Sequence, residues 1–329
     1  MNLTVEPSTD TGYARPRDPA EIWVARHWQH VLGFGVGIRE NFFGVGGNSL
    51  DAARVINFVL DEFDHQLPLN AVMENPTVER LAALVREENG RALSHPLVEV
   101  QSGDGTHPPL FVVHPASGQV GSYCHLARAL GDEFTLFGLQ PAGLYTDEEP
   151  VTTVEAMARV YLDAIRAVEP AGPYFLAGCS TGAAIAFELA GLLTGAGAEV
   201  RLLAAIDQDL IGPADDIVDS SLHQLVDGQA LTQAQVLDDW KNHDLVPHDE
   251  NPDFVARSLR VWRANHDAVR DWRPARYAGP LDVFRDPGSG RPRPVDWPAT
   301  VVERAHECAV GPDGTHVTAV AEDLRRLIG

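Results

Sequence analysis

The feature that most constrains this 329-residue chain is the pentapeptide Gly178-Cys179-Ser180-Thr181-Gly182, which follows the apolar run Tyr174–Ala177 and precedes the helical stretch Ala183–Leu193. A G-x-S-x-G turn between a strand and a helix is typical of a nucleophile elbow, where the serine occupies a strained turn that only small neighbours permit. The alternative is a chance Gly/Ser turn, which the flanking strand and helix disfavour. The pattern therefore predicts that Ser180 is a nucleophile in an α/β domain.

Other apolar runs extend this α/β domain. They alternate with helical stretches, which predicts buried strands of a parallel sheet at Leu110–Val113, Leu202–Ile206, Leu281–Phe284 and Val301–Glu303. Between about Ile211 and Arg273 the period is helical and no strand candidate occurs. An insertion of that kind between two sheet strands predicts a helical lid over about 211–273.

A serine nucleophile needs a base and an orienting acid, which in this fold class follow in the order Ser, Asp or Glu, His. The run Leu202–Ile206 ends at Asp207. An acid that leaves a strand at its carboxyl end lies on the active-site edge of such a sheet. Asp207 is therefore the expected acid, and Asp209, two residues further on, is its rival.

The base is expected near the C-terminus. His316 lies in a Gly-containing loop just before the final helix, predicted at 317–328. The third member of such a triad is expected at this position. His306 and His114 are the rivals, although His114 is expected to shape the loop after the strand at 110–113, and His306 to be a core or loop residue.

Two neighbours of the predicted nucleophile complete the expected site. The backbone N–H of Thr181, at a helix N-terminus, points toward a developing oxyanion, and a turn in the segment 114–118 presents the N–H of Ala116 as a second donor. Cys179 is a rival nucleophile by position. Its place in the motif directs it away from the tip of the turn, so a small buried residue is expected there.

The N-terminal region has helical periodicity instead. Helices are expected at 21–32, from Ser49 onward, at 71–74, and after an N-cap at Thr77. The expected organisation is a flexible segment at 1–16, a helical bundle at 17–88, a polar linker at 89–96 and the α/β domain at 97–329.

The loop before the second helix, 41–50 (NFFGVGGNSL), is the second candidate site. The paired phenylalanines are expected to anchor the loop, and the Gly-Gly pair to turn the chain so that Ser49 stands exposed at a helix start. A phosphate ester on that hydroxyl would lie at the positive end of the helix dipole. Capping of the helix by Asn48 or Ser49 explains the same residues equally well.

Composition excludes several classes of partner. The formal charge of −22 argues against nucleic acid and anionic membrane surfaces. The N-terminus has no secretory signal pattern and no apolar run is long enough to span a bilayer, so a cytoplasmic protein is expected. The three cysteines lack CxxC spacing, and His243 and His248 lack i, i+4 spacing, so neither a disulfide framework nor a metal site is expected.

The motif NFFGVGGNSL resembles the carrier-protein motif of nonribosomal peptide synthetases, and the resemblance extends over about 16–88. The second half resembles the type I thioesterase domain of such synthetases, an α/β-hydrolase. The matching segments are PLFVVHPASGQVGSYCHLARALG, LFGLQPAGL, the GCSTG turn and the terminal His316. The sequence departs from the family pattern at Ser117, Cys179 and Ala183, and in a longer loop before His316.

The resemblance implies a role for each site residue. Ser49 is implied to bear 4′-phosphopantetheine, Ser180 to be acylated, Asp207 and His316 to complete the triad, and Ala116 and Thr181 to be the oxyanion donors. The implied partners are a phosphopantetheinyl transferase, upstream condensation and adenylation modules, and an acyl or peptidyl thioester. A monomer is expected, and the lack of an adenylation-domain tail favours a free-standing protein over one cut from a longer synthetase.

The expected function is that of a carrier–thioesterase in nonribosomal peptide biosynthesis, a branch of secondary metabolism that makes antibiotics and siderophores. The acyl group passes from the arm of Ser49 to Ser180 and is released by hydrolysis or cyclisation. Two alternatives stay open at this point. One is an editing or transacylating thioesterase acting on stalled groups, and the other is a working carrier joined to a catalytically idle docking domain.

Overall fold

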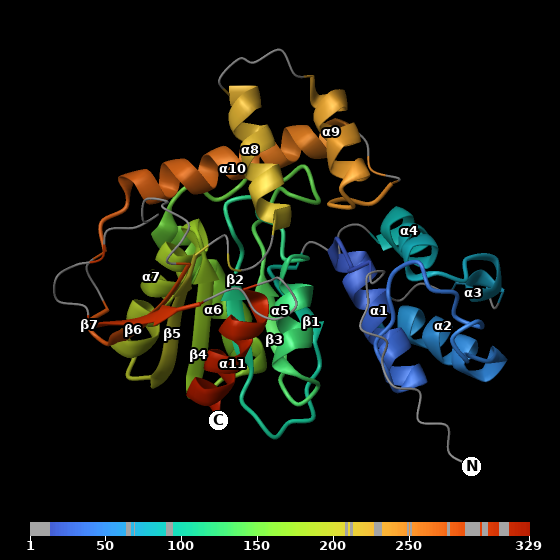
Figure 1. The fold of residues 1–329 in the computed structure, drawn as a ribbon, viewed down its shortest axis with the longest axis horizontal. Helices are drawn as coiled ribbons and strands as arrows, with labels where there is room; N and C mark the ends of the chain where they lie inside the picture. The colour runs from blue at the N-terminus through green and yellow to red at the C-terminus, as the bar shows by residue number, and fades with distance from the viewer. Residues whose placement is uncertain are drawn as a thin grey trace.

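The computed structural model describes two domains, a helical one followed by an α/β one (Figure 1). The residues described are 14–63, 67–68, 70–89, 95–207, 210, 213–226, 232–248, 250, 252–274, 277–286, 297, 302–308 and 316–329. Within them, none of the helices combines the length and apolarity needed to cross a membrane.

The first domain is a bundle of four described helices. They are α1 (Pro19–Leu32), α2 (Ser49–Phe63), α3 (Ala71–Glu74) and α4 (Val78–Asn89). Helix α1 begins two residues before its predicted start, because the Asp18 side chain accepts a hydrogen bond from the Glu21 N–H at 2.8 Å and caps it. Thr77 caps α4 as predicted, accepting from the Arg80 N–H at 3.3 Å.

The second domain is built on a sheet whose seven described strands run in the order β1-β3-β2-β4-β5-β6-β7. They are β1 (Leu97–Gln101), β2 (Leu110–Val113), β3 (Leu136–Leu139), β4 (Tyr174–Cys179), β5 (Val200–Ile206), β6 (Pro280–Arg285) and β7 (Val302–Glu307). Strands β1 and β3 were not among the predicted strands. The predicted strands pair in parallel as expected, and the one antiparallel pairing among the described strands is that of the unpredicted β1 with β3.

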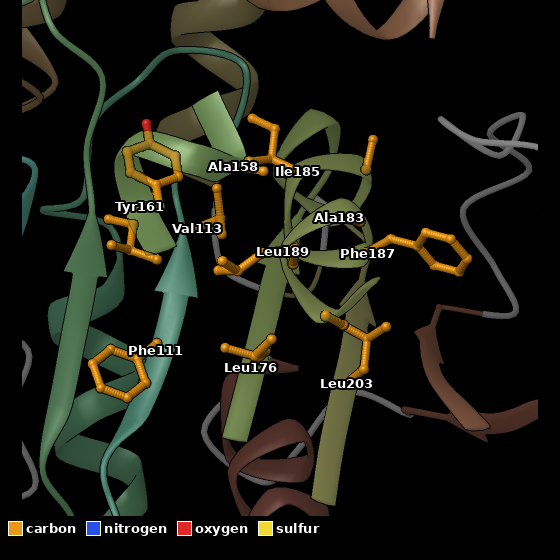
Figure 2. Packing of buried hydrophobic residues seen from close by; sticks show 14 of the residues in the cluster. Phe111, Val113, Ala158, Tyr161, Leu176, Ala183, Ile185, Phe187, Leu189 and Leu203 are labelled. Carbon is orange, nitrogen blue, oxygen red and sulfur yellow. The ribbon is translucent and has the colours of Figure 1, made fainter. Parts of the chain in front are cut away.

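Helices cover both faces of the sheet (Figure 1). Helices α6 (Val154–Val168) and α7 (Thr181–Gly195) pack on one face, and α5 (Tyr123–Leu130) and α11 (Val317–Ile328) on the other. Figure 2 shows the first of these cores, where Val113 and Leu176 of the strands lie beside Leu189 of α7. Helix α7 is buried along most of its length, so its N-terminus is fixed rigidly over the sheet.

The described residues between β5 and β6 include three helices, at the place where the sequence predicted a helical insertion. They are α8 (Pro213–Val226), α9 (Gln233–Asn242) and α10 (Pro252–Asp271), and they lie together beyond the carboxyl ends of the strands (Figure 1). A hydrophobic cluster holds them together, with Trp240, Phe254 and Trp262 at its centre. The same cluster includes Ala116, so the insertion packs directly on the loop that follows β2.

Candidate active site and carrier serine

Ser180 occupies a strained turn between β4 and α7. Its φ of 52° and ψ of −122° lie in a region that residues other than glycine rarely adopt. β4 ends at Cys179 and α7 begins at Thr181, so the whole reversal of the chain is made at Ser180. This is the strand–turn–helix geometry that the sequence predicted for a nucleophile elbow.

The two glycines of the motif are imposed by close backbone contacts. A Cβ atom on Gly178 would lie 2.3 Å from the carbonyl oxygen of Gly182, and a Cβ on Gly182 would lie 2.3 Å from the carbonyl oxygen of His114. Real Cβ atoms do not approach backbone so closely, and this confirms the reason given for small residues at both positions. Cys179 is fully buried in the sheet core, as expected for a packing residue.

Backbone hydrogen bonds align the carboxyl ends of four neighbouring strands. The Ser180 N–H donates to the carbonyl of Ile206 at 3.2 Å, and the Asp207 N–H donates to the carbonyl of Phe284 at 3.0 Å. The Cys308 N–H donates to the carbonyl of Arg285 at 2.8 Å. The residues that leave β4, β5, β6 and β7 therefore meet along one edge of the sheet, where active-site residues of such folds collect.

His316 lies on this edge, just before α11. Its Nδ1 is 2.9 Å from the carbonyl oxygen of Cys308. A carbonyl oxygen only accepts, so Nδ1 is the donor in this contact. A histidine that acts as general base toward a serine also has its proton on Nδ1. The Nε2 atom lies 3.6 Å from Oδ2 of Asp286.

Asp286 is a functional candidate that the sequence analysis missed. It directly follows β6, as Asp207 directly follows β5, so the rule that selected Asp207 selects Asp286 equally well. Burial raises the pKa of the Cys308 thiol to about 11, and the charges of Asp323, Asp207 and Asp286 contribute in the same direction, so both carboxylates act on this thiol. Contact of Asp207 with His316 stays a prediction, and Asp209 lies outside the described residues.

The rival histidines have structural surroundings. Nε2 of His306, on β7, lies 2.8 Å from Oδ1 of the fully buried Asp282, which occupies that nitrogen. His114 is fully buried, with Nδ1 2.7 Å from the carbonyl oxygen of Pro115. Burial lowers the pKa of His114 to about 4. The surroundings of His114 agree with the expectation that it shapes the loop after β2. His306 was expected to be a core or loop residue, but it lies half-buried on the edge strand β7.

The loop that contains Ala116 is held by helix α10 of the insertion. The side-chain Nδ2 of the buried Asn265 donates to the carbonyl oxygen of Ala116 at 3.0 Å. Gly118 has a φ of 83°, and a Cβ there would lie 2.9 Å from the side chain of Val261. Both contacts come from α10, so this helix fixes the conformation of the loop. The roles of the Ala116 and Thr181 N–H groups as oxyanion donors stay predictions.

Ser49 has surroundings opposite to those of Ser180. It is exposed at the first residue of α2. The side-chain oxygen of Asn48 accepts from the Leu50 N–H at 2.8 Å and from the Asp51 N–H at 3.1 Å, so Asn48 caps the helix. Within the described part of the chain, no hydrogen bond engages the Ser49 hydroxyl. Capping therefore does not account for a serine at this position.

The loop before Ser49 is anchored as predicted. The Phe42 ring is fully buried in the bundle core, and the Phe43 ring packs edge-on against it at 5.3 Å. Gly46 has a φ of 111°, and a Cβ on Gly47 would lie 2.5 Å from the Phe42 ring. The two glycines thus allow the sharp turn that brings the chain to the start of α2.

Known protein families match both domains. The family model described as a thioesterase domain matches residues 108–324. The family model described as a phosphopantetheine attachment site matches residues 23–85, a range that includes Ser49.

One curated relative and one solved structure match over both halves of the chain, and another relative matches over a part of it. Malpinin synthetase of Mortierella alpina is 31% identical over 333 residues, covering 93% of this chain and 4% of that protein. A dimodular nonribosomal peptide synthase of Bacillus subtilis (strain 168) is 34% identical over 193 residues, covering 58% of this chain and 8% of that protein. The chain therefore spans a small fraction of these relatives. The crystal structure of a four-domain nonribosomal peptide synthetase, holo-AB3403, bound to AMP and glycine, has a TM-score of 0.75 and 24% identity, covering 99% of this chain and 27% of that one.

Proposed function

This chain belongs to the thioesterase domain family in its second domain and to the phosphopantetheine attachment family in its first, and we propose that it is a carrier–thioesterase of nonribosomal peptide biosynthesis. An acyl or peptidyl group carried on Ser49 is transferred to Ser180 and then released. The observation that carries the proposal is the pairing, in one chain, of an exposed serine at a helix start with a strained serine at a nucleophile elbow.

The surroundings of Ser49 fit a covalently attached phosphopantetheine. Its hydroxyl is exposed and is not used to cap α2, because Asn48 does so. The N-terminus of α2 favours a phosphate ester at this hydroxyl. When bound, phosphopantetheine supplies a flexible thiol that carries the acyl group as a thioester. Ser49 thus holds the group, and the exposed turn leaves it room to move.

The reaction at Ser180 is an acyl transfer with a defined path for the proton. His316 Nε2 accepts the hydroxyl proton while Ser180 Oγ bonds to the thioester carbonyl carbon. The carbon–sulfur bond then breaks, and the thiolate that leaves takes the proton back from His316. In the second half, His316 accepts a proton from water, or from an amine or hydroxyl of the substrate, as that nucleophile attacks the ester carbonyl carbon. The bond between this carbon and Ser180 Oγ then breaks, and Oγ takes the proton back from His316. These alternatives give hydrolysis or cyclisation.

Two groups assist His316 and two assist the oxyanion. The Cys308 carbonyl holds the Nδ1–H tautomer, and Asp207 is the proposed acid that stabilises the imidazolium. Asp286, 3.6 Å from Nε2, is the second candidate for this role. The N–H groups of Ala116 and Thr181 are proposed to bind the negative oxygen of the tetrahedral intermediate.

The insertion helices are proposed to act as a lid. They lie beyond the carboxyl ends of the strands, where the site residues meet (Figure 1). α10 contacts the oxyanion loop directly through Asn265. A lid at this position controls how much water reaches the acyl-enzyme. Admitting water favours hydrolysis, and excluding water favours attack by an amine or hydroxyl of the substrate itself.

The proposed partners follow from the carrier. A phosphopantetheinyl transferase modifies Ser49, and condensation and adenylation modules load it. The relatives named as peptide synthetases support this assignment. The intact nucleophile elbow favours a catalytic second domain over an idle docking domain. An editing thioesterase would differ from a product-releasing one in the acyl groups that it accepts.

The test is to load Ser49 with octanoyl-phosphopantetheine, using a transferase and octanoyl-coenzyme A, and to follow the intact mass. We expect the wild-type chain to lose the octanoyl group and Ser180→Ala to retain it. Equal retention in both proteins would indicate an idle second domain. Failure of Ser49 to accept the arm would exclude the carrier, and rapid loss only of short groups such as acetyl would favour editing.

A further inference from the structure

Helix α1 joins the two domains by close packing. It lies on the side of the bundle that faces the second domain (Figure 1). Ile22 is buried in the same hydrophobic cluster as Val98 of β1 and Cys124 of α5. A Cβ on Gly121 would lie 2.6 Å from the carbonyl oxygen of Arg17, so backbone meets backbone at this point. Such an approach is typical of a formed interface, not of two domains that merely lie near each other.

Ion pairs surround this apolar contact, with the cations on the first domain and the anions on the second. Arg26 Nη1 lies 2.5 Å from Oε2 of Glu99 on β1. Arg39 is paired with Asp244, in the turn after α9 of the insertion. Nη1 of the fully buried Arg17 lies 3.9 Å from Oδ1 of the same Asp244. Charges of opposite sign on facing surfaces fix the register of an interface.

Helix α2 lies on the other side of the bundle. It packs on α1 and α3, and α1 stands between it and the second domain (Figure 1). Ser49 is exposed at its start, and the neighbouring Leu50 is 64% exposed. In the docked arrangement, the attachment face therefore points to solvent.

We propose that the contact of α1 with β1, α5 and the 243–248 turn is a resting dock, which presents Ser49 to the enzymes that load it and must release before Ser49 delivers its acyl group to Ser180. The inference rests on the proposed function. Beyond that function, the inference assigns a docking surface on the thioesterase domain and names its partner, which is the carrier domain of the same chain. The dock and the delivery state exclude each other, because α1 separates Ser49 from the second domain in the dock.

The test reverses the charge of each member of the ion pair between Arg26 on the first domain and Glu99 on the second. Arg26→Glu and Glu99→Arg each place like charges in contact, and the double variant restores an opposite pair. Both residues lie on regular elements, so neither substitution strains the backbone. Asp244→Asn removes the second anion and retains a residue type that tolerates its φ of 54°.

Opening of the dock is measured without catalysis, in protein that lacks the arm. Cys124 is 8% exposed and lies in the interface cluster, so its alkylation by N-ethylmaleimide reports release of α1. Cys308, buried at the far edge of the sheet, is the internal reference. We expect roughly three- to tenfold faster alkylation of Cys124 in each single variant and the wild-type rate in the double variant.

Delivery is then measured as loss of octanoyl from loaded Ser49. We expect it to be faster by a similar factor in the single variants and restored in the double, with an unchanged rate of loading by the transferase. Unchanged alkylation of Cys124 would overturn the dock. Faster alkylation with equal or slower delivery would overturn its resting role. Faster alkylation with no delivery in any variant would leave the dock supported and refute the proposed thioesterase function.

Discussion

The two candidate serines both stand at the N-terminus of a helix, yet their surroundings differ in every other respect. Ser180 is 9% exposed, has a φ of 52° and is wedged between glycines that contact backbone. Ser49 is exposed, lies within a regular helix and is preceded by a side chain that does the capping. Strain and burial pre-organise one hydroxyl to react in place, whereas exposure lets an outside enzyme modify the other.

The largest expected effect comes from separating the two serines into different molecules. Ser180→Ala, loaded with octanoyl-phosphopantetheine on Ser49, should retain its acyl group about ten-thousandfold longer than the wild type. A second protein, the Ser49→Ala variant, retains the nucleophile elbow but cannot carry the arm. When it is added, we expect release from the loaded Ser180→Ala protein at a rate that rises with the concentration of the Ser49→Ala protein. Intact mass distinguishes the two proteins. Release from Ser180→Ala alone at the wild-type rate would contradict the division of roles.

The next effect separates the two acids at the sheet edge. We expect Asp207→Asn to lower kcat about a thousandfold toward octanoyl-N-acetylcysteamine, because the acid that stabilises the imidazolium is lost. Asp286→Asn should lower kcat about tenfold, because it removes one charge near Nε2. Steady-state kinetics of the two variants decide the assignment. The reverse order would overturn Asp207 as the acid of the site and show that the charge of Asp286, on the Nε2 side of the ring, matters more to the imidazolium.

A smaller effect is expected where the insertion holds the oxyanion loop. Asn265→Ala should lower kcat about tenfold with little change in KM, because the Ala116 carbonyl loses its donor and the loop its orientation. Asn265→Asp retains the shape of the side chain but lacks the Nδ2–H donor, so it should lower kcat as Asn265→Ala does. Ser258→Ala, another fully buried polar residue on α10, is the matched control and should retain kcat. An equal loss in both would show that only the stability of α10 matters.

Much of the fold could be predicted because the signals were local. Strand β2 and helix α11 have the predicted bounds, since a short apolar run and an amphipathic stretch each define their own ends. Strand β3 was not predicted because Gly138 interrupts its apolar run. The structure gives the reason for the glycine, since a Cβ there would lie 2.8 Å from the side chain of Val120. Strand β1 escaped because it is a half-exposed edge strand.

The site was predictable only in part, for a different reason. The elbow and the carrier loop are contiguous in sequence, so their glycines and serines could be identified directly. Neither candidate acid is contiguous with His316 in sequence, and Asp286 lies near His316 only because β6 and β7 align their carboxyl ends. The tautomer set by Cys308 and the support from Asn265 likewise depend on contacts between distant segments, which no local pattern encodes.

The smallest expected effect compares how the two domains respond to acid. Burial lowers the pKa of His114 in the second domain and of His27 in the first to about 4. Unfolding returns each ring to a pKa near 6.5, so the unfolded chain binds more protons between these values. The resulting stability is present above about pH 6.5 and is lost as the pH falls toward 4.

The measurement follows each domain separately, by denaturant-dependent amide exchange of its own peptides at pH 7 and pH 5. His114 should cost the second domain up to about 1.4 kcal/mol per pH unit, and the less buried His27 should cost the first domain less. His114→Gln should reduce the response of the second domain only, where His125, whose pKa is also lowered to about 4 by desolvation, retains a part of it. His27→Gln should reduce the response of the first domain only. If either variant reduced the pH response of both domains equally, the two domains would unfold as one unit. The interface through α1 would then be too strong for a dock that has to open.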